Sequence, residues 1–82
     1  MTKLEKNIIL SNLNLVIDIN RVGSDEIDVI NECLDILNKP VQEITKLDKI
    51  QCSTNISELL EWSDRLGSDE YEILGESLEL LI

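Results

Sequence analysis

The chain has no histidine and no phenylalanine, and its 82 residues include a single tryptophan and a single tyrosine. Histidine is the commonest general base and a frequent metal ligand, so the side chain most useful for acid–base chemistry is missing. The two cysteines, Cys33 and Cys52, lack a base partner and the close spacing of a zinc site, and no calcium-loop pattern occurs. We therefore expect neither an enzyme nor a protein that holds a metal or cofactor.

Basic residues are scarce as well. Seven lysines and arginines stand against seventeen aspartates and glutamates, which gives a net charge of -10. Such a charge repels phosphate backbones and anionic membrane surfaces, so we expect no direct binding of nucleic acid or membrane. A basic protein is the favoured partner.

Long apolar runs and a credible signal peptide are also missing. The N-terminus MTKLEKNIIL carries an early glutamate, and no apolar segment approaches the roughly 18 residues that span a bilayer. We expect a cytoplasmic protein whose cysteines are both free thiols, with a single disulfide between them as the alternative. Cys33 is expected on the inner side of a helix, where a thiol behaves as a small hydrophobe.

The sequence contains one long internal resemblance. The segment RVGSDEIDVINECLDIL, residues 21–37, returns as RLGSDEYEILGESLELL, residues 65–81, with eight identities in seventeen positions. Each copy predicts a helix end, a Gly-Ser joint with the glycine as a left-handed cap, and a second helix capped by the serine. We therefore expect an internally duplicated helix-Gly-Ser-helix corner.

The spacing of apolar residues predicts an all-α fold, a compact bundle of about five short helices in a single domain over residues 1–82. The first helix begins after the Thr2–Glu5 capping box, runs to Asn20 and is apolar almost all round. It is expected to be a buried central post or part of a dimer interface; a strand over 13–19 is the alternative. The remaining helices are expected at about 24–38, 41–50, 55–66 and 68–81, with a polar break at 51–54.

Two acidic stripes are the candidate binding surface. Residues 22–38 hold five acids and no base, and residues 58–82 hold eight acids with one arginine. Like charges three or four positions apart cost helix stability, so two stripes without interleaved lysines favour a surface for a basic partner over plain solvated helix faces. The stripe residues are Asp25, Asp28, Glu32 and Asp35 in the first copy, and Asp69, Glu72, Glu76 and Glu79 in the second.

Trp62 and Tyr71, the only aromatic residues, lie close to the second corner in the sequence. Packing in the core is one explanation for them. Because tryptophan and tyrosine are enriched among residues that carry binding energy, the other is that they anchor a partner beside the acids.

The C-terminal segment LLEWSDRLGSDEYEILGESLELL, in a small and strongly acidic helical chain, resembles the immunity proteins that neutralise nuclease toxins in contact-dependent inhibition and Maf-type systems. The resemblance covers about the last 25 residues. It implies a protein that binds a nuclease toxin domain one to one and blocks its substrate cleft, as an immunity protein or antitoxin. Two alternatives stay open: a phage nucleic-acid mimic acting on a host defence nuclease, and a helical adaptor that self-associates as a homodimer.

Overall fold

The computed structural model describes residues 1–19 and 21–82, and over these residues the chain forms four α-helices and one short 3-10 turn. The helices are α1 (Lys3–Ile19), α2 (Ser24–Leu37), α3 (Lys46–Trp62) and α4 (Ser68–Leu81), with the turn η1 (Val41–Glu43) before α3. The all-α prediction is confirmed. The alternative strand over 13–19 is wrong, because this segment lies inside α1. The predicted end of the first helix at Asn20 lies outside the described residues.

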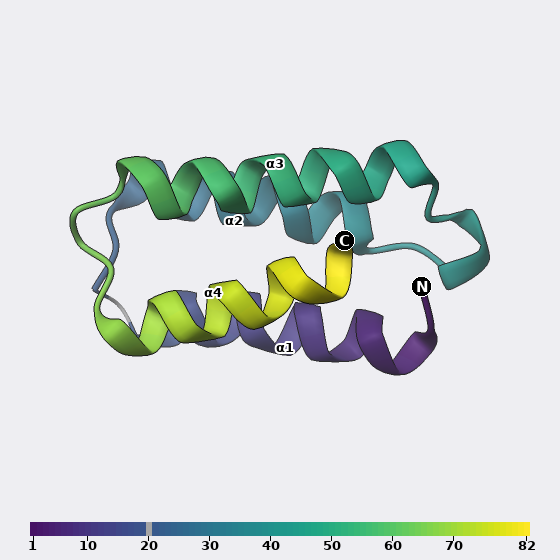
Figure 1. Cartoon of the computed structure of the whole chain (residues 1–82), viewed down its shortest axis with the longest axis horizontal. Helices are drawn as coiled ribbons and strands as arrows, with labels where there is room; N and C mark the ends of the chain where they lie inside the picture. Colours follow the sequence, from purple (N-terminus) through teal and green to yellow (C-terminus); the bar gives the residue numbers. More distant parts are fainter. Residues whose placement is uncertain (20) are drawn as a thin grey trace.

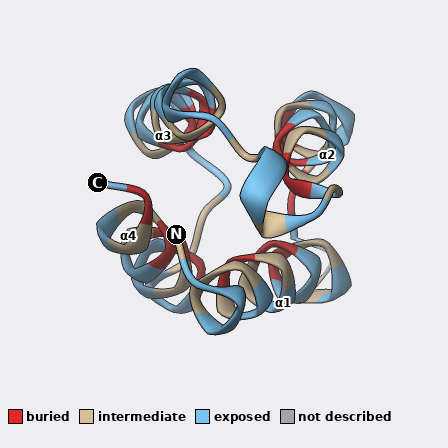
Figure 2. Ribbon diagram, turned by 90° about the vertical axis from the view of Figure 1, so that its right-hand side faces the viewer, coloured by how far each residue is buried: buried red, intermediate tan, exposed pale blue. Residues whose placement is uncertain are grey.

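The four helices stand at the corners of a square when the bundle is viewed from its end (Figure 2). Helix α1 packs on α4 and α2, and α3 packs on the same two helices, so α2 and α4 lie on one diagonal. Both chain ends and the connection between α2 and α3 lie toward one end of the bundle, and the α1–α2 and α3–α4 connections lie at the other (Figure 1). The faces turned inward carry the buried residues.

Aliphatic side chains and the two cysteines form the core. Each helix buries one row of residues at helical spacing, which is the arrangement that an amphipathic helix requires. The row of α1 and the row of α3 match when the two helices are aligned on their first residues. The buried apolar residues of these two rows are Ile9, Leu13 and Val16 in α1, and Cys52, Ile56 and Leu59 in α3.

Helix α3 is continuous where the sequence predicted a polar break. Residues 51–54 form part of α3. Gln51 and Thr54 in this segment face outward, while Cys52 belongs to the buried row of the helix. The helix begins later than expected, after a capping box in which the Thr45 hydroxyl accepts from the Asp48 N–H at 3.1 Å and the Asp48 carboxylate accepts from the Thr45 N–H at 2.9 Å. The expected helices at 41–50 and 55–66 are therefore replaced by η1 and one long helix.

Helix α1 does not occupy a central position. Although most of its side chains are apolar, it stands at a corner of the bundle and only one side of it is buried. Leu15 illustrates the difference, because 46 % of its surface remains exposed. On a helical wheel Leu15 lies next to the polar arc that contains Ser11 and Asp18. Its position beside these polar residues, rather than its own hydrophobicity, accounts for its exposure.

The glycines at the two corners have another role than the predicted left-handed cap. Gly23 and Gly67 are the residues directly before α2 and α4, and both have extended backbone with negative φ. A Cβ atom at Gly23 would collide with the guanidinium of Arg65, and one at Gly67 would come within 2.8 Å of the guanidinium of Arg21. Each glycine leaves room for the arginine side chain of the opposite corner, which passes over it.

These arginines reach two buried carboxylates. Arg65 pairs with Glu26 at 3.1 Å, and Arg21 pairs with Glu70 at 3.5 Å. Each glutamate is completely or almost completely buried in the first turn of its helix, whereas each arginine is about half exposed. The corner before α2 thus supplies an arginine to α4, and the corner before α4 supplies one to α2. These crossed ion pairs join the two halves of the chain at one end of the bundle.

Replacing the glycines separates crowding from helix propensity. We expect Gly23→Ala to lower the free energy of unfolding by about 1 to 2 kcal/mol, because the methyl group displaces Arg65 from Glu26. The matched change Gly75→Ala, inside α4 where an added Cβ meets nothing within 4 Å, should raise stability by up to about 1 kcal/mol. Urea unfolding of the two variants measures both effects, and a shift of the same sign in both would contradict the crowding.

Removal of Arg65 tests the crossed pairs. Arg65→Met leaves the buried Glu26 with only the Ser63 hydroxyl at 3.1 Å, so we expect a loss of about 1 to 3 kcal/mol in unfolding free energy, reduced by the exposure of the arginine. The control Lys39→Met removes the partner of the more exposed Asp48, and it should cost less than about 1 kcal/mol. Equal losses in urea denaturation would show that burial of Glu26 is unimportant.

Candidate protein-binding surface

The acidic stripe of α4 borders a groove. The groove has a volume of about 390 Å³ and lies between α1 and α4, with Asp69, Glu72 and Glu76 among its lining residues. The outward side of α4 carries these acids because its other side supplies Leu74 and Leu81 to the core. Glu79, the fourth stripe residue, is also exposed and lies one turn beyond Glu76. The structure therefore brings three of the four predicted residues to one site.

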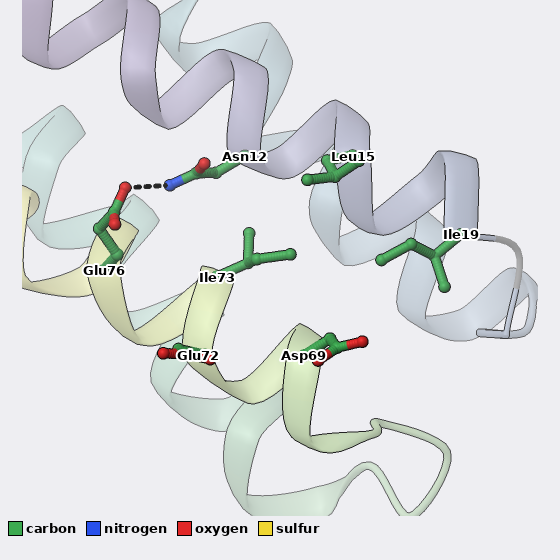
Figure 3. Close-up of a pocket in the computed structure, with 7 residues that line it drawn as sticks. All are labelled: Asn12, Leu15, Ile19, Asp69, Glu72, Ile73 and Glu76. Carbon is green, nitrogen blue, oxygen red and sulfur yellow. Dashed lines mark hydrogen bonds between the residues drawn. The ribbon is translucent and has the colours of Figure 1, made fainter.

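Apolar side chains lie between these acids and α1. Leu15 and Ile19 project from α1, and Ile73 projects toward them from α4 (Figure 3). At one end of the groove the Asn12 amide donates to the Glu76 carboxylate at 3.0 Å and to the Ser77 hydroxyl at 3.2 Å. The groove thus combines an apolar strip with a row of carboxylates.

The stripe of α2 faces another direction. Its residues Asp25, Asp28, Glu32 and Asp35 are all exposed. Glu32 accepts a hydrogen bond from Gln51 of α3 at 3.3 Å, so this stripe runs along the α2–α3 edge, whereas the α4 stripe runs along the α1–α4 edge. Because α2 and α4 are diagonal in the bundle, the two stripes lie on different sides of the molecule.

Neither stripe is neutralised within the described part of the chain. The ion pairs found there use Glu26, Glu70 and Asp48, none of which belongs to a stripe. The cations that are closest in sequence are Arg21, Lys39 and Arg65, and they pair instead with Glu70, Asp48 and Glu26. The eight stripe carboxylates therefore face solvent without a cationic partner in residues 1–19 and 21–82.

The aromatic residues lie at the surface, so the expectation that they pack in the core is wrong. Trp62 at the end of α3 is 48 % exposed, and Tyr71 in α4 is 44 % exposed. The Tyr71 hydroxyl donates to the Leu60 carbonyl at 3.1 Å, which fixes the ring against α3. Neither residue lines the groove between α1 and α4. Their role as anchors for a partner stays a prediction.

Sequence reasoning missed four residues of the groove: Asn12, Leu15, Ile19 and Ile73. Leu15 and Ile19 belong to the first helix, which was expected to be buried, and Ile73 was assigned neither to the core nor to a site. A further signal was present in the capping segments Thr-Lys-Leu-Glu-Lys, residues 2–6, and Thr-Lys-Leu-Asp-Lys, residues 45–49. When the two segments are aligned in sequence, every position of α1 has a counterpart in α3. The counterpart of Leu15 is an acid, Glu58, and not a residue of the core.

The two cysteines are buried between α2 and α3. Cys33 and Cys52 are both free, and each sulfur approaches the carbonyl of the other residue, at 3.8 and 3.9 Å. The contact with Cys33, together with burial, raises the pKa of the Cys52 thiol. Cys52 is therefore uncharged at neutral pH, and its surroundings are those of a core residue rather than of a nucleophile.

No protein-family model matches the chain, and no match was found among curated proteins or among solved structures. Within residues 1–19 and 21–82, no cluster of acidic or cysteine side chains has the arrangement of a metal site. No helix in the same residues is long and apolar enough to cross a membrane. The surface itself is thus the basis for a functional interpretation.

The burial of the cysteines predicts slow reaction with thiol reagents. In native protein at neutral pH we expect both thiols to be protected at least about a hundredfold relative to protein in denaturant, because reaction requires opening of the bundle. Absorbance of a coloured thiol reagent followed over time measures the rate. Rapid labelling of either cysteine in the folded protein would contradict the packing of α2 on α3.

Proposed function

We propose that this chain is an acidic binding protein whose partner is a basic protein surface. More specifically, we propose an inhibitor of the immunity-protein or antitoxin type that binds a nuclease toxin domain one to one and covers its cationic substrate cleft. The exposed carboxylates would occupy the positions of substrate phosphates. In this proposal the chain has no catalytic role of its own and acts in the cytoplasm.

The observation that supports the proposal is the lack of neutralisation along both stripes. The bases nearest to the stripes in the sequence are Arg21, Lys39 and Arg65, and they pair with Glu70, Asp48 and Glu26, none of which is a stripe residue. The carboxylates that remain at the surface repel one another, which is unfavourable for the isolated helices. A cationic partner would relieve this repulsion, and it would be attracted over a distance set by the salt concentration.

The positions of the stripes support a one-sided contact. Because α2 and α4 are diagonal, a single compact cleft would cover one stripe and leave the other in solvent. Trp62 and Tyr71 are exposed enough to contribute apolar area at the edge of such a contact.

We further propose that the chain consists of two copies of one helical hairpin, α1–α2 and α3–α4. The seventeen-residue resemblance, the two Thr-Lys-Leu-acid-Lys capping segments and the crossed ion pairs support it. Duplication explains why two acidic stripes exist at all: each hairpin carries one. The functional proposal then requires only one of them to be in use.

Charge reversal of single stripes tests the function. We expect Glu72→Lys with Glu76→Lys, or Asp28→Lys with Glu32→Lys, to weaken inhibition of a cognate nuclease by roughly a hundredfold, in line with about 3 kcal/mol for two desolvated charge pairs. The two double variants have equal net charge and serve as controls for each other. Inhibition of nuclease activity is the measurement, with circular dichroism confirming the fold.

An unchanged inhibition constant in both double variants would refute the charge-based mechanism. Sedimentation of the isolated protein separates the self-association alternative, because a homodimeric adaptor would change mass with concentration and would bind no basic protein. The inhibitor, by contrast, is expected to form a complex with one copy of each chain.

A further inference from the structure

The groove between α1 and α4 differs chemically from the rest of the acidic surface. Leu15, Ile19 and Ile73 form an apolar strip, and Asp69, Glu72 and Glu76 lie beside it. Leu15 is 46 % exposed, so a substantial aliphatic area remains in contact with water. A surface that only imitated phosphates would need the charges without this apolar strip.

The α2–α3 edge differs from the α1–α4 edge at the position that corresponds to Leu15. When α1 and α3 are aligned on their capping boxes, the counterpart of Leu15 is Glu58, which is exposed. The two edges therefore carry similar stripes of acids, on α4 and on α2. They differ in the residue on the neighbouring helix, which is Leu15 in α1 and Glu58 in α3. In the same alignment Trp62, which is 48 % exposed, is the counterpart of Ile19, so the α2–α3 edge also carries apolar area; it has a carboxylate where the groove between α1 and α4 has Leu15.

From this combination we infer that the α1–α4 groove is the docking site for a cationic amphipathic segment of the partner protein. The segment would place aliphatic side chains against Leu15, Ile19 and Ile73 and direct lysine or arginine side chains to Asp69 and Glu72. Charge complementarity selects the cationic segment, and the apolar strip selects one with aliphatic residues on a single side. The inference rests on the proposed function for the nature of the partner, and it adds the site and the chemistry of the contact.

The geometry supports an extended contact. The three acids of the groove are spaced three and four residues apart in α4, so they form a row along the groove side of this helix: Asp69, Glu72 and Glu76. At one end the row meets Asn12, whose amide donates to Glu76 at 3.0 Å. Asp69 and Glu72 are the groove carboxylates that accept no side-chain hydrogen bond and form no ion pair within the described chain. A helix or an extended strand of the partner lying along the groove would meet both kinds of side chain at once.

A peptide titration of the full-length protein tests the site. The probe is a short helix-forming peptide of lysine, leucine and alanine with its leucines on one side, and the control peptide has the same composition with the leucines dispersed. With isotope-labelled protein we expect the amphipathic peptide to shift the amide signals of Asn12, Leu15 and Ile73, and to bind at least about tenfold more tightly than the control. Equal affinities, or shifts centred on α2, would overturn the inference.

Two leucines of α1 provide a matched pair of variants. Leu15→Ser removes an aliphatic side chain from the groove, whereas Leu4→Ser removes one that is 69 % exposed and does not line it. Neither residue belongs to the core, so both variants should retain the fold and the net charge. We expect roughly a tenfold loss of affinity for the amphipathic peptide in Leu15→Ser, and a change within about twofold in Leu4→Ser. Similar losses in both variants would overturn the site.

The outcomes distinguish this inference from the function on which it rests. If the peptide binds the groove as described but no nuclease is inhibited, the docking site stands and the inhibitor function fails. If a nuclease is inhibited equally well by the native protein and by Leu15→Ser, while reversal of the α2 stripe abolishes inhibition, the function stands and the docking site is wrong.

Discussion

The arrangement of the bundle depends on two ion pairs that cross between its halves. Arg65 reaches Glu26 and Arg21 reaches Glu70, so each helical corner neutralises a buried carboxylate of the other. A buried carboxylate without a cation would be strongly unfavourable, and this requirement favours only those arrangements in which the corners lie face to face. Glycine before α2 and before α4 leaves the space that the arginine side chains occupy. The corners are thus fixed by charge, while aliphatic packing holds the remainder of the bundle.

The same constraint shapes the surface. Because the two arginines are engaged with Glu26 and Glu70, they are unavailable to the acids on the outer sides of α2 and α4. The acids of α2 and α4 therefore form two groups: the buried pair Glu26 and Glu70, and eight exposed residues that contribute to the negative field. Placing α2 and α4 on a diagonal directs that field to two sides, and on the side shared with α1 the acids line a groove together with aliphatic residues.

Much of the helix content followed from the sequence, and the exceptions have physical causes. The helix at 24–37 was predicted closely, because its aliphatic and acidic residues separate cleanly. The predicted break at 51–54 is wrong, because the segment continues the helix with Cys52 and Ile56 in its buried row, and a short polar run does not end a helix whose apolar periodicity persists. The acids of the candidate surface were predicted as exposed, and they are. Glu26 and Glu70 were not recognised as buried, because within their own helices they resemble any other acid of a first turn.

The sequence by itself determined that the chain is helical and strongly acidic, and that its acids lie in two stripes, because helical periodicity and charge are properties of neighbouring residues. Only the tertiary structure decided which acids are buried, which cations they receive and where Leu15, Ile19 and Ile73 meet the α4 stripe. These features arise from residues far apart in the chain. Their burial and pairing depend on how the helices pack, which local patterns do not specify.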